Sequence, residues 1–262
     1  MMPILTFDLE TIPDVDALRQ LRPHWAGLDD RAVAAQAMAE RRERTGNDFL
    51  PLHLHRVLVI GCAFRDESGF RVRSLGAPAD DEPKLIGDFF RLIDRYTPQL
   101  VSWNGSAFDL PVLQYRALIH GVPGRRYWDQ GDEDRDLRYS NYVNRYHLRH
   151  VDLMDVLSRY QGRAAAPLDE VARLSGFAGK LGMEGSQVWD TYCSGQIERI
   201  RAYCETDVVN TYLLYCRFRK IRGQLDDSEY ATELELVRDA LAASGEPIWQ
   251  EFLNAWPATP SR

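Results

Sequence analysis

The hydrophobic and polar positions along the first half of the chain predict alternating strands and helices. Apolar runs at residues 2–9, 57–65 and 70–75 are short and bounded by turn residues, which is typical of buried strands. Residues 83–96 carry apolar side chains at helical spacing, and another apolar run follows at 100–103. This order predicts an α/β fold whose sheet begins with a meander.

The second half of the chain is dominated by helical patterns. An Asn-Gly turn at residues 104–107 opens a helix that Gly121 ends. We expect the later helices to flank the sheet, because both faces of a sheet in an α/β fold need cover. Apolar residues recur at helical spacing over 151–160, 168–174, 196–219, 228–243 and 247–256.

Two segments lie outside the α/β pattern. Residues 13–54 separate the first two predicted strands and contain a helical pattern that Asp29 or Asp30 can cap, so we interpret them as an insertion or cover. Residues 223–262 form a C-terminal helical extension, which we expect to pack on a main domain of residues 1–222.

The composition is that of a folded protein without a membrane span. The 262 residues are 45% hydrophobic and 27% charged, and the longest apolar run, residues 57–64, is far shorter than the roughly 20 residues that cross a bilayer. The first ten residues contain two acids and no signal-peptide pattern, and the four cysteines form no C-x-x-C pair. We therefore expect a soluble, cytoplasmic protein without zinc or disulfides.

The charge distribution limits how the chain can meet nucleic acid. The net charge is −7, and only three of the 32 basic residues are lysines, so a nucleic-acid footprint must be local. Residues 124–149 hold six arginines interleaved with five aromatic residues, a mixture typical of single-strand binding grooves. Five acids nearly cancel that charge, so a salt-bridged surface loop is an equal alternative for this segment.

Acidic residues stand at places where side chains can converge. Asp8 and Glu10 lie two apart at the exit of the first predicted strand, so their carboxylates share a face and can hold a hard divalent cation. Asp109 opens a helix after a strand, and Tyr203 and Asp207 lie one helical turn apart. Each feature also has an ordinary explanation: solvated turn acids, a helix cap, or a core-edge tyrosine beside an exposed acid.

Taken in order, these residues resemble a known family. The stretches F-D-L-E-T at residues 7–11, N-G-S-A-F-D at 104–109 and Y-C-E-T-D at 203–207 resemble the DEDD-type 3′–5′ exonucleases with a tyrosine in the third motif. The chain is most similar to bacterial predicted exonucleases related to the proofreading domain of family B DNA polymerases. This resemblance covers residues 4–218, and it implies a ribonuclease-H-like mixed β-sheet flanked by helices, with a helical C-terminal extension.

The resemblance also implies a reaction and its residues. It implies a metal-dependent 3′–5′ exonuclease that uses two divalent cations, Mg²⁺ or Mn²⁺, to release nucleoside 5′-monophosphates from single-stranded DNA. Asp8, Glu10 and Asp207 would hold one metal, and Asp8 with Asp109 the other. Tyr203 would position the attacking water, since a tyrosine with a pKa near ~10 is a poor base at neutral pH.

Further contacts to the terminal nucleotide are less specific expectations. Thr11 and Asn104 would make polar contacts, and Leu9 and Phe108 would stack or wedge against the base, although core packing explains the two apolar residues equally well. Lys180 either touches phosphate from its loop or is simply solvated, and we expect the second.

Two acids are left outside the predicted site. Asp152 and Asp155 fall within the helical pattern of residues 151–160, three residues apart. This spacing places them on one face of the expected helix, so we interpret them as supporting or surface acids.

Alternative functions stay open at this point. The same chemistry can act on RNA, because nothing in the sequence reads a 2′-hydroxyl. A catalytically silent nucleic-acid-binding module is the non-enzyme alternative. Phosphatases that form an aspartyl-phosphate also place an aspartate after the first strand, but they need D-x-D where this chain has Glu10. The chain has no room for a polymerase domain, so it would work beside a separate protein partner in replication or repair.

Overall fold

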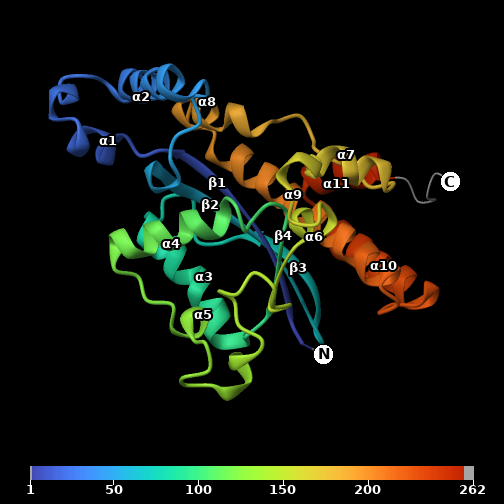
Figure 1. The fold of residues 1–262 in the computed structure, drawn as a ribbon. Helices are drawn as coiled ribbons and strands as arrows, with labels where there is room; N and C mark the ends of the chain where they lie inside the picture. Colours follow the sequence, from blue (N-terminus) through green and yellow to red (C-terminus); the bar gives the residue numbers. More distant parts are fainter. Residues whose placement is uncertain (1, 257–262) are drawn as a thin grey trace.

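A five-stranded mixed β-sheet lies at the centre of the computed structural model, which describes residues 2–256 (Figure 1). The strand order is β3-β2-β1-β4-β5, with antiparallel pairing from β3 to β1 and parallel pairing from β1 to β5. This arrangement confirms the predicted α/β class and its opening meander. The strands are β1 Ile4–Pro13, β2 His55–Asp66, β3 Gly69–Ser74, β4 Gln99–Ser102 and β5 His150–Asp152.

Helices cover both faces of the sheet. Helices α3, α4 and α5 lie on one face, and the long helix α9 with α10 and α11 lies on the other (Figure 1). Within residues 2–256, no helix combines the length and apolar character that crossing a bilayer requires. The helices are α1 Val15–Leu21, α2 Asp30–Thr45, α3 Glu82–Tyr96, α4 Asp109–His120, α5 Arg125–Trp128, α6 Leu153–Leu157, α7 Leu168–Leu174, α8 Val188–Cys193, α9 Ile197–Ile221, α10 Asp227–Ser244 and α11 Pro247–Ala255.

Strand β1 divides its side chains between two cores. Leu5, Phe7 and Leu9 pack with α3 and α4, whereas Ile4 packs with α9 on the opposite face. Because side chains alternate along a strand, the even positions of β1 face α9. The carboxylate of Asp8 therefore meets α9 rather than the α3–α4 core.

Helix α9 approaches the sheet unusually closely beside that carboxylate. Gly61 of β2 pairs with Asp8 across the antiparallel ladder. A Cβ atom at Gly61 would lie 2.7 Å from Sγ of Cys204 on α9, which is too short for a contact between two non-bonded heavy atoms. The absence of a side chain at this position lets the helix lie against the strand that carries Asp8.

The segment between β1 and β2 forms a small helical unit with its own apolar cluster. Helix α2 is capped by Asp29, whose carboxylate accepts the amide N–H of Ala32, and ends at Gly46. Trp25, buried within this cluster, packs among residues of α1 and α2, and Trp189 of α8 packs against it from the main body. An ion pair from Arg31 to Asp190 also joins α2 to α8. The resulting unit stands over one end of the sheet beside α8 (Figure 1).

The C-terminal helices pack on α9 and the sheet. Trp249 and Phe252 of α11 are buried in the core cluster that α9 shares with the sheet. Glu233 of α10 pairs with Arg65 of β2 at 2.7 Å and accepts a hydrogen bond from the hydroxyl of Tyr212. Residues 257–262 of the expected extension lie outside the described residues.

Two details of the predicted elements are wrong. Strand β1 continues to Pro13 with a register irregularity after Glu10, so Asp8 and Glu10 lie inside the strand rather than at its exit. Residues 150–152 form β5 beside β4, and the following helix is short, because Asp152 ends the strand and caps α6. A three-residue strand is too short to show a period-2 alternation, so the surrounding helical pattern predicted a helix here.

We expect Gly61→Ala to destabilise the protein by about 1–3 kcal/mol, since the added methyl must displace Cys204 or the whole of α9. Chemical denaturation monitored by circular dichroism measures this change. Gly27→Ala is the matched control, because a Cβ there meets no atom within 4 Å. Equal stability of the two variants would contradict the close packing of α9 on β2.

Candidate active site

One groove of about 860 Å³ contains every residue predicted for the site. Its walls come from β1, the start of α4, the middle of α9 and the segment between α2 and β2. The structure therefore brings together three sequence motifs that lie about 100 residues apart. The predicted residues that line it are Asp8, Leu9, Glu10, Thr11, Asn104, Phe108, Asp109, Tyr203 and Asp207.

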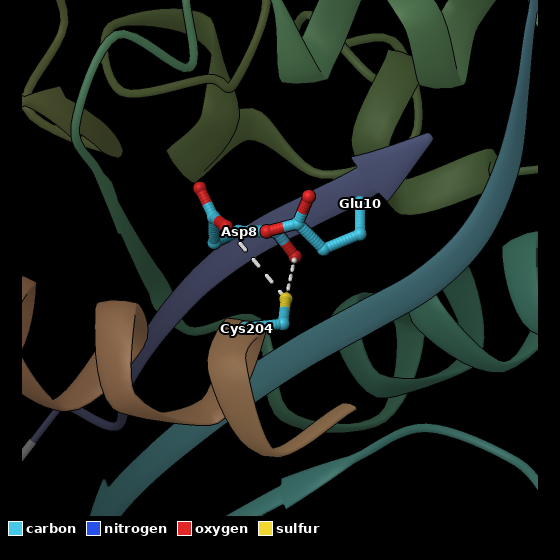
Figure 2. Close-up of side chains that lie close together, drawn as sticks. All are labelled: Asp8, Glu10 and Cys204. Atoms are coloured by element: carbon cyan, nitrogen blue, oxygen red, sulfur yellow. Dashed lines mark hydrogen bonds between the residues drawn. The ribbon is translucent and has the colours of Figure 1, made fainter. Parts of the chain in front are cut away.

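Asp8 and Glu10 project from β1 toward α9 (Figure 2). Together with Cys204 they offer three ligand atoms that all lie within 4.8 Å of one another. The Cys204 thiol donates toward the carbonyl oxygen of Asp8 at 3.4 Å and toward its carboxylate at 3.6 Å. This contact fixes the Asp8 carboxylate against the helix and leaves Glu10 facing the same space.

Asp109 connects α4 to the central strand. Its carboxylate accepts the backbone N–H of Leu9 at 2.9 Å, and its side chain is almost fully buried. The cap position of α4 is Phe108, and Asp109 is the first residue of the helix. The carboxylate is therefore held by β1, next to Asp8, and does not serve as the cap of its own helix.

Asp207 supplies a buried oxygen atom that lacks a partner. Its Oδ1 atom is inaccessible to solvent and has no hydrogen bond within the described part of the chain. Its Oδ2 atom lies 3.4 Å from the ammonium of Lys180. A buried oxygen left without a donor is costly, so this atom fits the role of a cation ligand.

Lys180 belongs to the site, and the expectation that it is solvated is wrong. Its ammonium donates to the Tyr203 hydroxyl at 2.5 Å besides pairing with Asp207. Asn210 of α9 holds the loop in place by exchanging two hydrogen bonds with the backbone of Gly179. Lys180 sits in an aperiodic loop, so sequence pattern alone gave no reason to place it beside the carboxylates.

The four carboxylates resist ionisation in this pocket. Burial raises the pKa of Asp8 and Glu10 well above the usual range, and the neighbouring carboxylates raise both pKa values further. Burial also raises the pKa of Asp109 to about 7 and the pKa of Asp207 to about 6, although Lys180 lowers the latter. Bound divalent cations would remove this electrostatic cost, so the residues present fit a metal site.

Asp152 supports the site from the end of β5. Asp152 ends β5 and does not lie on a helix face as expected. Its carboxylate accepts the backbone N–H groups of Asn104 and Ser106 at 2.9 and 2.8 Å. These bonds hold the turn before α4, in which Asn104 adopts a left-handed backbone conformation with φ of 69°. Asp152 thereby fixes where α4 begins, and with it the position of Asp109.

The residues predicted to contact the nucleotide also line the groove. The Thr11 hydroxyl is bonded to Nδ1 of His55 at 2.9 Å. Phe108 packs its ring against His55 at the groove wall, with centroids 5.4 Å apart. The side chain of Leu9 is buried in the core that α3 and α4 share, and its backbone N–H bonds the Asp109 carboxylate of the site.

The arginine- and aromatic-rich segment of residues 124–149 contributes no lining residue to this groove in the described structure. Tyr127 and Tyr142 are buried and stack on each other, with ring centroids 5.8 Å apart. Arg126 pairs with Asp134, as expected for a salt-bridged loop. The segment therefore uses part of its aromatic and charged side chains for internal packing.

The mixed sheet is the fold that the motif resemblance implies, and one groove brings together the four carboxylates and the tyrosine of the three motifs. The chain belongs to the family of predicted 3′–5′ exonucleases related to the exonuclease domain of PolB, whose family model matches residues 47–256. This match confirms the resemblance drawn from the motifs. The first motif, with Asp8 and Glu10, precedes the matched range, so its place in the site rests on the structure.

Two DNA polymerases are similar to parts of this chain. A DNA polymerase of Archaeoglobus fulgidus is 30% identical over 137 residues, which are 51% of this chain and 17% of the polymerase. The structure of the family B DNA polymerase from Pyrobaculum calidifontis aligns with 98% of this chain and 27% of its own, at 18% identity and a TM-score of 0.49. The chain thus spans less than a third of either polymerase.

Without metal, the raised pKa values of Asp109 and Asp207 predict that stability falls with increasing pH. The folded state favours the protonated form of both carboxyl groups. Their contribution to stability is therefore complete below the pKa of the unfolded chain, near ~4, and is lost as pH rises through about 6 to 7. Denaturant titrations from pH 4 to 8 in a chelator, for wild type and for Asp109→Asn with Asp207→Asn, measure this loss. We expect the wild type to lose several kcal/mol more than the variant, since each pKa unit corresponds to about 1.4 kcal/mol, and we expect Mg²⁺ or Mn²⁺ to restore this stability. Parallel curves would contradict the pKa assignment.

Proposed function

We propose that this protein is a metal-dependent 3′–5′ exonuclease that removes nucleoside 5′-monophosphates from the 3′ end of single-stranded DNA. The observation that carries the proposal is the convergence of four carboxylates, one with an unpartnered buried oxygen, beside Tyr203 and Lys180 in a single groove. The family supports the direction of cleavage, and its relation to a polymerase domain favours DNA. The groove is lined partly by aromatic and apolar side chains, which suit unpaired bases.

In this proposal the carboxylates bind two cations, Mg²⁺ or Mn²⁺, both of which are hard ions that prefer oxygen ligands. Asp8, Glu10 and Asp207 would hold one, and Asp8 with Asp109 the other. When bound, such a pair stabilises the attacking and leaving oxygens of a phosphodiester and acidifies the attacking water. The Asp109–Leu9 bond and the Cys204–Asp8 contact keep two of these carboxylates oriented.

Tyr203 positions the attacking water and does not remove its proton. Burial raises the pKa of its hydroxyl above the ordinary value, and the nearby carboxylates raise it further. The hydroxyl oxygen accepts from Lys180, so the hydroxyl acts as a donor on its other side, where it faces the Asp207 carboxylate and the groove. Lys180 in turn places a positive charge at the edge of the carboxylates, where a phosphate would bind.

The rest of the chain has supporting roles in this proposal. Thr11 and Asn104 would contact the terminal sugar, and Leu9 and Phe108 would border its base. Residues 1–222 would form the exonuclease domain, with 223–262 as an appended helical pair. A protein partner in replication or repair is part of this proposal.

A time course on 5′-labelled single-stranded DNA and the matching RNA, each with Mg²⁺ or Mn²⁺, tests the proposal. We expect a ladder that shortens from the 3′ end of DNA only when metal is present. Asp8→Asn and Asp207→Asn should each lower the rate by about 100-fold or more, because each removes a ligand charge. Asp155→Asn is the control, since Asp155 lies outside the groove and pairs with Arg145. Preferred cleavage of RNA would change the substrate class, and no cleavage of either polymer would refute the proposal.

We expect Tyr203→Phe to lower kcat by about 10- to 100-fold while leaving cation affinity and melting temperature near the wild-type values, because only the positioning of water is lost. Single-turnover kinetics and calorimetric metal titration separate these effects. Tyr192→Phe makes the same chemical change at a hydroxyl that bonds Arg56 outside the groove. Full kcat in Tyr203→Phe would exclude a role for the hydroxyl.

A further inference from the structure

An aromatic residue outside the motifs stands in the wall of the groove. Phe49, in the segment between α2 and β2, is 50% exposed and lines the groove. Its ring contacts His55 at 4.8 Å and Phe108 at 5.8 Å between centroids, and those two rings contact each other. The three rings form one aromatic shelf, with Phe49 as its most exposed member.

Hydrogen bonds fix the imidazole ring of this shelf. Nε2 of His55 lies 3.0 Å from the carbonyl oxygen of Leu50, which can only accept, so Nε2 carries the hydrogen. In the neutral ring Nδ1 then accepts from the Thr11 hydroxyl. The imidazole that supports Phe49 is thus bonded on both sides and cannot turn without breaking these bonds.

The shelf adjoins the carboxylates through the chain itself. Phe108 immediately precedes Asp109, and Thr11, which bonds His55, immediately follows Glu10. A phosphodiester bound at the carboxylates would therefore hold the base of its terminal nucleotide within reach of these rings. A flat, half-exposed ring suits a nucleobase of any sequence, because every base has a π face.

We propose that Phe49 is a stacking residue for the base of the 3′-terminal nucleotide, so that the segment of residues 13–54 contributes to the substrate site. This inference rests on the proposed function and assigns part of its substrate recognition. It predicts that the enzyme holds the terminal base by stacking and not by reading its hydrogen-bonding edge. The stacked base covers the face of Phe49 that His55 and Phe108 leave open.

Equilibrium binding of the reaction products tests the proposal without catalysis. Calorimetry with Mg²⁺ compares deoxyadenosine 5′-monophosphate with deoxyribose 5-phosphate, which lacks the base. We expect Phe49→Ala and Phe49→Leu to weaken the nucleotide by roughly 5- to 150-fold and to leave the sugar phosphate unchanged, as one lost stack predicts. Phe49→Trp should bind the nucleotide at least as tightly as wild type. Phe49→Leu keeps apolar packing without a flat ring, so it separates stacking from packing.

Kinetics on oligonucleotides gives a second readout. Phe49→Ala should raise KM for an ordinary 3′ end but match the wild type on a 3′ end whose last nucleotide is abasic. Tyr115→Ala is the matched control, because Tyr115 is 48% exposed and lies outside the groove. Melting curves verify that each variant is folded.

The outcomes separate this inference from the proposed function. Equal affinities of wild type and Phe49→Ala for the nucleotide, in a wild type that degrades DNA, would overturn the shelf alone. An equal loss of affinity for the nucleotide and the sugar phosphate would also overturn it, since the ring would then only maintain the structure of the groove. A wild type that binds the nucleotide through Phe49 but degrades no polymer would support the shelf and refute the exonuclease.

Discussion

Four carboxylates crowded into one pocket are the constraint on which the rest of the structure depends. Burial and mutual repulsion both disfavour their ionised forms, so the surrounding scaffold must supply the free energy that keeps them together. The cores on the two faces of the sheet do this, with α3 and α4 on one side and α9 on the other. The pocket therefore carries an electrostatic cost that bound cations would relieve.

The position of β1 explains why three distant motifs can meet. It pairs with β2 on one side and β4 on the other, and α4 begins just after β4. Asp109 reaches back to the backbone of β1, while α9 crosses the opposite face with Asp207. Strand β1 is bonded to Asp109 at the start of α4 and packs against α9, so its Asp8 can meet carboxylates from both helices.

The motifs predicted most of the candidate site, because carboxylates at fixed spacings on regular elements are visible in sequence. Lys180 and Phe49 were missed for a common reason: each lies in an irregular segment, where no periodicity reports which way a side chain points. Asp152 was misplaced because β5 is only three residues long and the pattern around it is helical. The residues that were not predicted are those whose side-chain positions depend on tertiary contacts.

The contact between Gly61 and Cys204 has a consequence for how such a site can vary. The two residues occupy one fixed volume between β2 and α9, next to the Asp8 carboxylate. A larger residue at position 61 fits this helix position only if the residue at position 204 is smaller. The side-chain volumes at the two positions are therefore coupled. The second letter of the Y-C-E-T-D motif is therefore set by steric room in the neighbouring strand as well as by chemistry.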